Sequence, residues 1–309
     1  MRLRLSRTRD FFENNFNLVL IAAFIAGLVV PGLPHLPNWT ILVTVGAVIF
    51  FSFSRLEWSD IGHIKIKEAL FFYLCRYIIL PLPLYFIFLF ILPDYALAVL
   101  LLSLMPAGVA VMPLTIISRG NGSLALSLTV ISTLLAPFLV PFVFAIAGHD
   151  IDLNIMSMFG TLVSLIFIPI LVFFIIVRPV PKLNKTVKDN GAFLSVVNLA
   201  LMLMIVIAKQ REYILSEFSS LVWHMAILFP LFFVFYLIGW FIFPKIRLEE
   251  RISYAYGSGA MNNVISISLA FLYFNPEVAL IMVLTEIPWV LSIPVFQAFL
   301  HRYRFNKNL

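Results

Sequence analysis

Ten long apolar segments dominate the sequence and restrict the folds that this chain can adopt. Each has close to the roughly 20 residues that a helix needs to cross the hydrocarbon core of a bilayer. The chain is 62% hydrophobic and only 12% charged over 309 residues, which is too apolar for a soluble globular protein of this size. We therefore predict an all-α polytopic membrane protein. The expected spans are about Phe16–Val30, Trp39–Ser54, Ala69–Leu92, Tyr95–Ser118, Gly122–Gly148, Ile155–Val177, Ala192–Ala208, Ser220–Phe243, Ile252–Phe274 and Glu277–His301.

The lysine and arginine residues test this count, because positively charged loops stay on the cytoplasmic side of a membrane. Of the 21 such residues, 18 fall in the two termini and in the loops after even-numbered spans. The opposite loops hold only Lys209 and Arg211, and Arg76 lies within span three. This bias predicts ten spans with both termini in the cytoplasm. The short basic termini and the lack of long loops between the spans favour a bacterial inner membrane.

Several other classes of protein are excluded by what the sequence lacks. The single cysteine, Cys75, rules out an intrachain disulfide and a cysteine-based metal cluster. There is no GxxxxGK[ST] loop, no HExxH and no GxSxG, so neither an ATP-driven pump nor a common hydrolase is indicated. The net charge of +6 follows from the basic loops and gives no reason to expect nucleic acid binding. We expect a protein that is not an enzyme and has no cofactor, whose partners are a small solute and membrane lipid.

The stretch Tyr256–Leu269, YGSGAMNNVISISL, lies inside span nine but is poor helix material in its first half. Gly257 and Gly259 each cost a helix interior roughly 1 kcal/mol relative to alanine. Asn262 and Asn263 place two amides at membrane depth. Irregular backbone survives there only where protein buries it or where it lines a wet cavity, so we predict a broken helix at a transporter binding site.

A matching interruption is predicted in span four, at Pro106–Pro113, where the sequence reads PAGVAVMP. Pro106, Gly108 and Pro113 are the residues expected to break the helix there. An offset of about 154 residues places this stretch on the one in span nine. Because five spans is an odd number, such a repeat is inverted in the membrane. We predict one membrane domain, with residues 1–178 holding the first five-span repeat plus span six, residues 179–309 holding the remainder, and the repeat boundary near residue 150.

Two ionisable residues lie well inside spans: Arg76 in span three and Glu286 in span ten. A charge at mid-bilayer costs at least about 2.5–3.5 kcal/mol, so such residues pair or line a cavity. One hypothesis is that they face the transport cavity, where Arg76 would meet an anionic substrate. The other is a structural Arg76–Glu286 ion pair. The two are not exclusive, and snorkelling of Arg76 to the interface is a third reading.

Polar residues near the second interruption are further candidates for substrate or ion binding. The amides of Asn262 and Asn263 can supply the oxygens or the donors that such sites need, although they can equally form hydrogen bonds between helices. Ser258 lies before them, and Thr129 lies in span five with Ser132. Serine and threonine in membrane helices usually bond back to their own backbone.

These motifs resemble the bile acid:sodium symporter family, the ten-span bacterial members in particular. The family's P-G-G-like start, R-G-N turn and S-T-L-x-x-P run correspond to Pro106–Gly108, Arg119–Asn121 and Ser132–Pro137. Its G-M-Q-N crossover is similar to Ala260–Asn263, and its linker ending in S-D is similar to Leu56–Asp60. The resemblance implies a panel domain and a core domain, with spans four and nine crossing at their unwound centres in the core.

The chain departs from that family at positions where sodium-coupled members carry polar ligands. It has Val111 and Met112 in place of a Ser-Asn pair, Ser258 in place of a glutamate, and Ala125 in place of a serine, while Thr129 is kept. Valine, methionine and alanine side chains offer no oxygen to Na⁺, which needs oxygen ligands. The resemblance therefore implies a member with altered or lost sodium coupling.

Arg76 aligns with a glutamine of the family when Pro81 is used as the anchor. A fixed positive charge there would repel Na⁺, so we expect Arg76 to take the place of one cation, with H⁺ at Glu286 as a possible coupling ion. The predicted function is secondary transport of an organic anion by alternating access. One alternative is a conventional sodium-coupled symporter with Na⁺ at Thr129, Asn262 and Asn263; another is a membrane sensor or scaffold that transports nothing.

Overall fold

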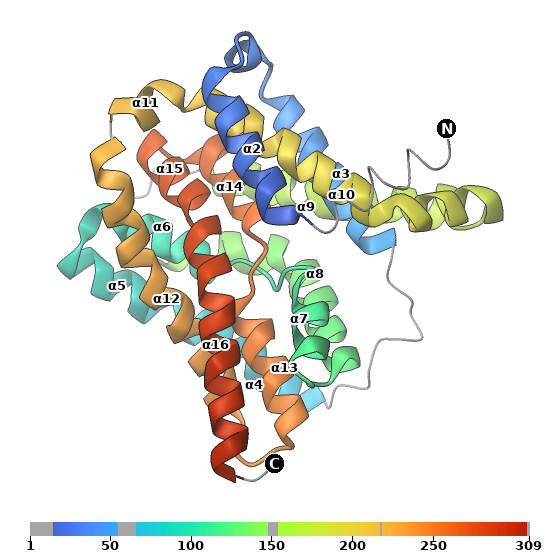
Figure 1. Ribbon diagram of the computed structural model, residues 1–309, viewed down its shortest axis with the longest axis vertical. Coiled ribbons are helices and arrows are strands. Elements are labelled where there is room, and N and C mark those ends of the chain that lie inside the picture. Colours follow the sequence, from blue (N-terminus) through green and yellow to red (C-terminus); the bar gives the residue numbers. More distant parts are fainter. Residues whose placement is uncertain (1–14, 55–65, 148–153, 217, 308–309) are drawn as a thin grey trace. The chain divides into compact units, whose positions relative to one another are not determined.

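A computed structural model describes residues 15–54, 66–147, 154–216 and 218–307. These residues are almost entirely helical, and extended pairing within them is limited to one isolated bridge (Figure 1). The prediction of an all-α protein is thereby confirmed. The expected repeat boundary near residue 150 and the linker Leu56–Asp60 lie outside the described residues.

The described helices have the length and composition of membrane spans. Six continuous apolar helices are long enough to cross a bilayer, and four shorter apolar helices accompany them. The long ones cover residues 66–91, 122–147, 155–177, 181–209, 221–242 and 276–305. The short ones begin at Leu18, Trp39, Pro93 and Asn263.

The chain divides into two compact units. The smaller comprises residues 1–57 and 160–218, and the larger comprises residues 58–159 and 219–309. The division falls within α9 (Ile155–Val172), after Phe159. The larger unit contains both of the spans in which the sequence predicts an interruption.

Helix α10 (Pro181–Lys209) is the centre of the smaller unit and packs against α2 (Phe16–Val29) and α3 (Trp39–Ser54). Ser195 of α10 lies 3.2 Å from the Ser52 hydroxyl of α3. The remaining elements are η1 (Leu33–His35), the π-helical turn η4 (Phe173–Val177) and α11 (Arg211–Ser216).

The start of α10 corrects one expectation from the sequence. The basic stretch Arg178–Asn190 falls between the predicted spans Ile155–Val177 and Ala192–Ala208, which makes it a predicted connection, but the helix begins at Pro181 and includes most of it. Proline is favoured in the first turn of a helix, because its fixed φ suits the helix and its missing donor is not needed there. Lys182, Lys185 and Lys188 then extend the helix beyond its apolar part, as good helix formers do.

The larger unit contains ten complete α-helical segments among its described residues, several of which are parts of one interrupted span. Helix α12 packs against α13 and α16, and α8 contacts α7 and α13. Its segments are α4 (Ile66–Leu74), α5 (Pro81–Ile91), α6 (Pro93–Ser103), α7 (Val111–Ile117), α8 (Gly122–Ala147), α12 (Leu221–Ile242), α13 (Leu248–Gly259), α14 (Asn263–Tyr273), α15 (Pro276–Leu284) and α16 (Glu286–Lys307), with the π-helical turn η3 (Cys75–Ile79) between α4 and α5 and the 3₁₀ turn η5 (Phe218–Ser220) before α12.

The turn η3 is a single wide turn with a local cause. Pro81 begins α5 and has no N–H to donate to the carbonyl group four residues earlier. The preceding backbone uses a longer ring instead, in which Leu80 N donates to Cys75 O at 2.9 Å. Such π-helical turns often mark functional sites, and Arg76 is the second residue of this one.

Candidate functional site

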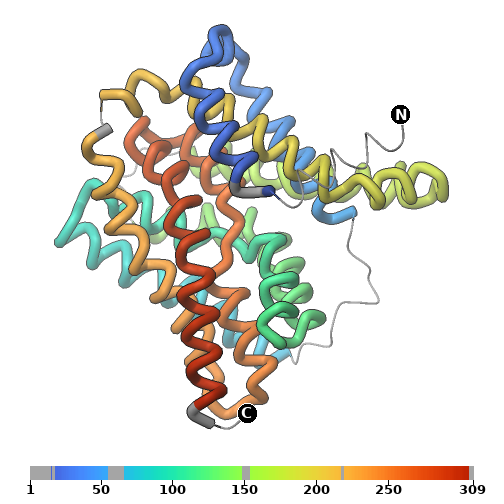
Figure 2. The backbone as a smooth tube through the Cα atoms, viewed as in Figure 1, coloured from blue at the N-terminus to red at the C-terminus, as the bar shows by residue number. Residues whose placement is uncertain are grey.

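Two interrupted helices cross at the centre of the larger unit. The chain leaves α6 after Ser103 and re-enters helix at Val111, and it leaves α13 after Gly259 and re-enters at Asn263. Figure 2 follows the backbone through both interruptions. There Ala107 and Met261 form an antiparallel bridge. Gly108 N donates to Ala260 O and Asn262 N donates to Pro106 O, each at 2.8 Å, so each interruption satisfies polar groups of the other.

Gly108 sets how closely the backbones of the two interruptions can approach each other. A Cβ atom added at this residue would lie 2.8 Å from Met261 O and 3.1 Å from Met261 C. Both are backbone atoms, which cannot move aside as a flexible side chain can. Only glycine therefore allows this crossing at its observed distance.

Helix α8 supports the crossing from the side with two hydroxyl groups. Ser132 Oγ accepts a 3.0 Å hydrogen bond from Ala107 N. Thr129 Oγ1 donates to Ala125 O at 3.1 Å and is 3.4 Å from Gly108 O. Ser132 thus satisfies a backbone donor that the interruption leaves without a helical partner.

Arg76 reaches the crossing from η3 and is fully buried. Its Nε donates to Ser258 O at 2.9 Å, its Nη1 donates to Ser103 O, and its Nη2 lies 3.1 Å from Met261 Sδ. The guanidinium also lies 4.7 Å from the ring centroid of Phe235. The charged group is therefore held by backbone carbonyl groups and a ring face, and it is not exposed to solvent.

Both carbonyl groups belong to ends of interrupted helices. Ser103 is the last residue of α6, and Ser258 lies in the last turn of α13. The C-terminus of a helix carries the equivalent of roughly half a negative charge. Two such ends converge on Arg76, which is the arrangement that binds a cation in transporters with broken helices.

The ion pair that was considered between Arg76 and Glu286 is not formed. Both residues are described, and the three guanidinium nitrogens of Arg76 contact Ser258, Ser103 and Met261 instead. Glu286 begins α16, where it is partly exposed and lies beside Asn263. Snorkelling of Arg76 is likewise not observed, because the side chain is fully buried.

Asn263 has unsatisfied polar atoms. Its residue is 3% exposed, and neither Oδ1 nor Nδ2 makes a hydrogen bond within the described part of the chain. A buried amide without a hydrogen-bond partner costs about 1–3 kcal/mol, and the Glu286 carboxyl group is the polar side chain beside this one. It begins α14, whose N-terminus is the positive end of that helix. Asn262 precedes it, with its side chain partly exposed and its backbone N bound to Pro106.

Three residues expected at the interruptions lie within helices. Gly257 and Gly259 are in α13, and the break begins at Ala260. A Cβ atom at Gly257 would lie 2.8 Å from Leu128 Cδ1, and one at Gly259 would meet the Tyr236 ring. Both glycines therefore allow close helix packing; Gly257 does so inside the helix, and Gly259 is its last residue, directly before the break. Pro113 is in the first turn of α7, where a missing N–H is tolerated.

The oxygen atoms near the crossing decide whether a sodium ion could bind there. Within the described residues no group of three or more His, Cys, Asp or Glu side chains could hold a metal. The Ser103 and Ser258 carbonyl groups, which would suit a cation, are occupied by Arg76. Asn263 Oδ1 and the Glu286 carboxyl group are another neighbouring pair of oxygen donors. A sodium ion therefore does not fit the Arg76 position, whereas an ion at Asn263 and Glu286 is chemically permitted.

Four residues of the site were not singled out from the sequence. Ser103 contributes a carbonyl oxygen, Met261 a thioether, Phe235 a ring face, and Tyr77 a second ring whose centroid is 4.9 Å from the guanidinium. Carbonyl groups are the same in every residue, so no sequence signal identifies Ser103. Tyr77 is the one of the four that a sequence signal could identify, because it follows the intramembrane arginine directly in the sequence.

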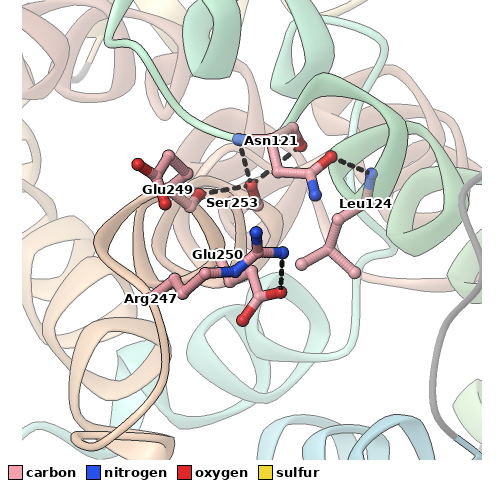
Figure 3. Close-up of polar contacts among 6 residues, drawn as sticks. All are labelled: Asn121, Leu124, Arg247, Glu249, Glu250 and Ser253. Atoms are coloured by element: carbon pink, nitrogen blue, oxygen red, sulfur yellow. Dashed lines mark hydrogen bonds and ion pairs between the residues drawn. The ribbon is translucent and has the colours of Figure 1, made fainter.

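A second polar link joins the segments that follow and precede the crossing (Figure 3). Asn121 N donates to Ser253 Oγ and to Glu249 O, both at 3.0 Å, and Ser253 Oγ lies 2.8 Å from Asn121 O. Asn121 Oδ1 also accepts from Leu124 N at 3.0 Å and so caps the start of α8. The same cap recurs at Asn275, whose side chain accepts from Val278 N at 2.9 Å.

Comparisons with known proteins agree with this architecture. Residues 40–217 match the model of the Sodium Bile acid symporter family. The chain is 23% identical over 277 residues to an uncharacterized sodium-dependent transporter, YocS, of Bacillus subtilis, covering 86% of this chain and 84% of that protein. It is 26% identical over 263 residues to the probable chloroplastic sodium/metabolite cotransporter BASS1 of Arabidopsis thaliana, covering 83% of this chain.

The chain spans 63% of the Arabidopsis protein and 55% of its rice counterpart, to which it is 29% identical over 231 residues. The family consists of membrane transporters and not of enzymes. The matched residues make up more than half of this chain and include η3, the first interruption and α8. The chain is a member of the sodium bile acid symporter family.

Proposed function

We propose that this chain is a secondary transporter that moves a small or amphipathic organic anion by alternating access, with altered or lost sodium coupling. Membership in the family supports transport. The proposals on substrate and coupling rest on the crossing of the two interrupted helices and on the Arg76 side chain that lies there.

The position of Arg76 is the observation that carries the proposal. A guanidinium bound to the ends of α6 and α13 satisfies the carbonyl groups that a sodium ion would otherwise satisfy. Its charge is part of the chain and cannot leave during a transport cycle. One positive charge would then be permanently present at the crossing, and no sodium gradient would be needed to supply it.

Asn263 and Glu286 are the proposed substrate and coupling groups. The Asn263 amide lies at the positive end of α14, which favours the carboxylate or sulfonate group of an organic anion. Glu286 lies beside it. A protonated Glu286 would remove the repulsion between its carboxylate and the anion, so we propose H⁺ as the coupling ion if the transport is coupled. Thr129 and Ser258 contribute to the site through main-chain groups: the Thr129 hydroxyl group lies 3.4 Å from Gly108 O, and Ser258 O accepts from Arg76.

An inverted repeat of five plus five spans is part of the proposal. The bridged residues Ala107 and Met261 are 154 positions apart, as are the two capping residues Asn121 and Asn275. Exchanging the two interruptions converts the hydrogen bond from Gly108 to Ala260 into the one from Asn262 to Pro106. Helices α8 and α15 begin at Gly122 and Pro276, again with that offset. These correspondences support a two-fold axis through the crossing.

The proposed topology has ten spans with both termini in the cytoplasm. The excess of lysine and arginine in the termini and in alternate loops supports it. A bacterial inner membrane is the proposed location. The repeats would divide near residue 150, with residues 1–178 holding the first repeat plus span six and residues 179–309 holding the remainder.

Reconstitution into proteoliposomes tests the function. Uptake of a radiolabelled bile acid and of a panel of labelled small carboxylates would be measured under an inward sodium gradient, an inward proton gradient, and neither. We expect uptake that does not require sodium and that Glu286→Gln uncouples from the proton gradient. No uptake of any anion, together with normal folding, would favour a sensor or scaffold over a transporter.

A sodium-coupled symporter is the second candidate, and the relatives favour it. The Bacillus protein is named a sodium-dependent transporter and the plant proteins are named sodium/metabolite cotransporters. In this chain the ion would bind near Thr129, Asn262 and Asn263, with Glu286 as a further oxygen donor. Uptake that requires sodium and that Asn263→Ala abolishes would establish this mechanism and refute the loss of coupling.

A further inference from the structure

A basic pocket lies at the end of the larger unit where α7 and α16 end, away from the crossing. It has a volume of about 460 Å³ and lies between the Ile117–Arg119 turn and the C-terminal half of α16. Three of its lining residues are basic, and two others carry polar groups. These are Arg119, His301 and Arg304, with Ser118 and Gln297.

The charges in this pocket have no acidic counterpart in its lining, as far as the described chain forms it. Arg119 and His301 are exposed, and Arg304 is partly exposed. Arg304 Nη2 donates to Ser118 O at 2.7 Å, which orients the guanidinium and leaves Nε and Nη1 as donors for a ligand. An arginine fork of this kind suits two oxygens of one phosphate group.

Apolar side chains border the same pocket. Phe305 is 78% exposed and Ile117 is 71% exposed, and both line it. Exposed apolar side chains of this size beside cations are expected where a protein surface meets lipid, with acyl chains on one side and headgroups on the other. The volume also exceeds what a lone phosphate ion needs.

We propose that this pocket binds the phosphate of an anionic membrane phospholipid, such as phosphatidylglycerol. The two arginines and His301 face the headgroup, and Ile117 and Phe305 contact the first part of an acyl chain. In the proposed topology this end of the unit is cytoplasmic, where anionic lipids and basic pockets between helices meet. The inference concerns a second site and holds whether or not the chain transports an anion.

Titration of the purified protein with short-chain phosphatidylglycerol tests this site. The protein would be held in nanodiscs of phosphatidylcholine, and binding would be followed by native mass spectrometry. Each arginine near a membrane surface contributes about 1 kcal/mol, or roughly fivefold in affinity. We therefore expect Arg119→Gln to weaken binding about fivefold and the double variant with Arg304→Gln about 25-fold.

Arg302→Gln is the matched control, because Arg302 is exposed on the same helix and does not line the pocket. It should leave the affinity unchanged. Arg304 also binds the end of α7, so the exposed Arg119→Gln variant keeps the test independent of any effect on folding. Unchanged affinity in Arg119→Gln would overturn the proposal. So would competition by inorganic phosphate at the same concentration as the lipid, because the site would then be one for free phosphate.

Discussion

Gly108→Ala is a direct perturbation of the crossing, and its cost can be worked out from the structure. The added methyl group would lie 2.8 Å from Met261 O and 3.3 Å from Ala260 O. The backbones of the two interruptions must separate by several tenths of an ångström to accept this methyl group. Gly108 N then loses its 2.8 Å hydrogen bond to Ala260 O, and Asn262 N is drawn away from Pro106 O. A buried backbone group left without a partner costs about 1–3 kcal/mol, so we expect a loss of about 2–4 kcal/mol.

The assay is thermal unfolding of the purified protein in detergent, followed by intrinsic fluorescence. Gly160→Ala is the matched control, because Gly160 is a helical glycine of α9 whose added Cβ atom would meet nothing within 4 Å. That control should leave stability unchanged or raise it by up to about 1 kcal/mol, since alanine is the better helix former. Gly108→Ala should also reduce transport, because the crossing positions the site.

Equal unfolding temperatures for Gly108→Ala, Gly160→Ala and the wild type would refute this reasoning. It would mean that the two backbones are not in close contact, or that their separation costs nothing. A destabilised Gly108→Ser variant, with Gly108→Ala unaffected, would contradict it as well, since both substitutions add the same Cβ atom.

Three further variants test the proposed roles of single residues in the same unit. Ser132→Ala leaves the buried Ala107 N–H without its 3.0 Å partner, and we expect a loss of about 1–3 kcal/mol in thermal unfolding; Ser132→Thr should recover most of it. Asn121→Ala removes the cap of α8 and should cost about 1 kcal/mol by the same assay. Glu286→Gln should make the uptake rate in proteoliposomes independent of pH between mildly acidic and mildly alkaline buffers, and an unchanged pH profile would exclude Glu286 as the proton carrier.

The apolar pattern of the sequence was sufficient to predict the fold class. Expected and observed helix bounds agree closely for Trp39–Ser54 and for the segment beginning at Gly122, because hydrophobic length is a strong signal in membrane proteins. The start of α10 was missed because hydropathy identifies only the apolar part of a helix. Its first turns are basic and lie before that part.

Neither glycine nor proline alone located the interruptions, because Pro113 lies within α7 while Pro106 and Gly108 lie between helices. Gly257 lies inside α13 against Leu128, and Gly259 is the last residue of that helix, against Tyr236. A glycine in a membrane helix permits close packing as readily as a break, and the sequence does not distinguish the two uses. Pro106 and Gly108 do lie in the first interruption, where each contributes to the crossing.

The partners of Arg76 could not be predicted for a different reason. The sequence showed a charged residue in a span and offered Glu286 as the obvious counter-charge. The structure instead uses the carbonyl groups of Ser103 and Ser258, which become available only because two helices end there. A partner of this kind depends on backbone geometry and leaves no pattern in residue types.

The most direct test of the central claim is the sodium dependence of thermal stability in the wild type and in Arg76→Gln. Both would be measured in NaCl, KCl and choline chloride at equal ionic strength. Arg251→Gln is the control, because Arg251 is a buried arginine that donates to Trp240 O, outside the crossing. An ion that binds only the folded state stabilises it by about 2.7 kcal/mol at a hundredfold excess over Kd, or roughly 4 °C for a chain of this length.

We predict that the wild type and Arg251→Gln unfold at temperatures that do not depend on the salt. Arg76→Gln should be destabilised in KCl and choline chloride and should recover stability in NaCl, with saturation, as sodium takes the place of the guanidinium. A saturable, sodium-specific rise in the unfolding temperature of the wild type would contradict the account. Sodium would then bind although Arg76 already occupies the carbonyl groups of Ser103 and Ser258.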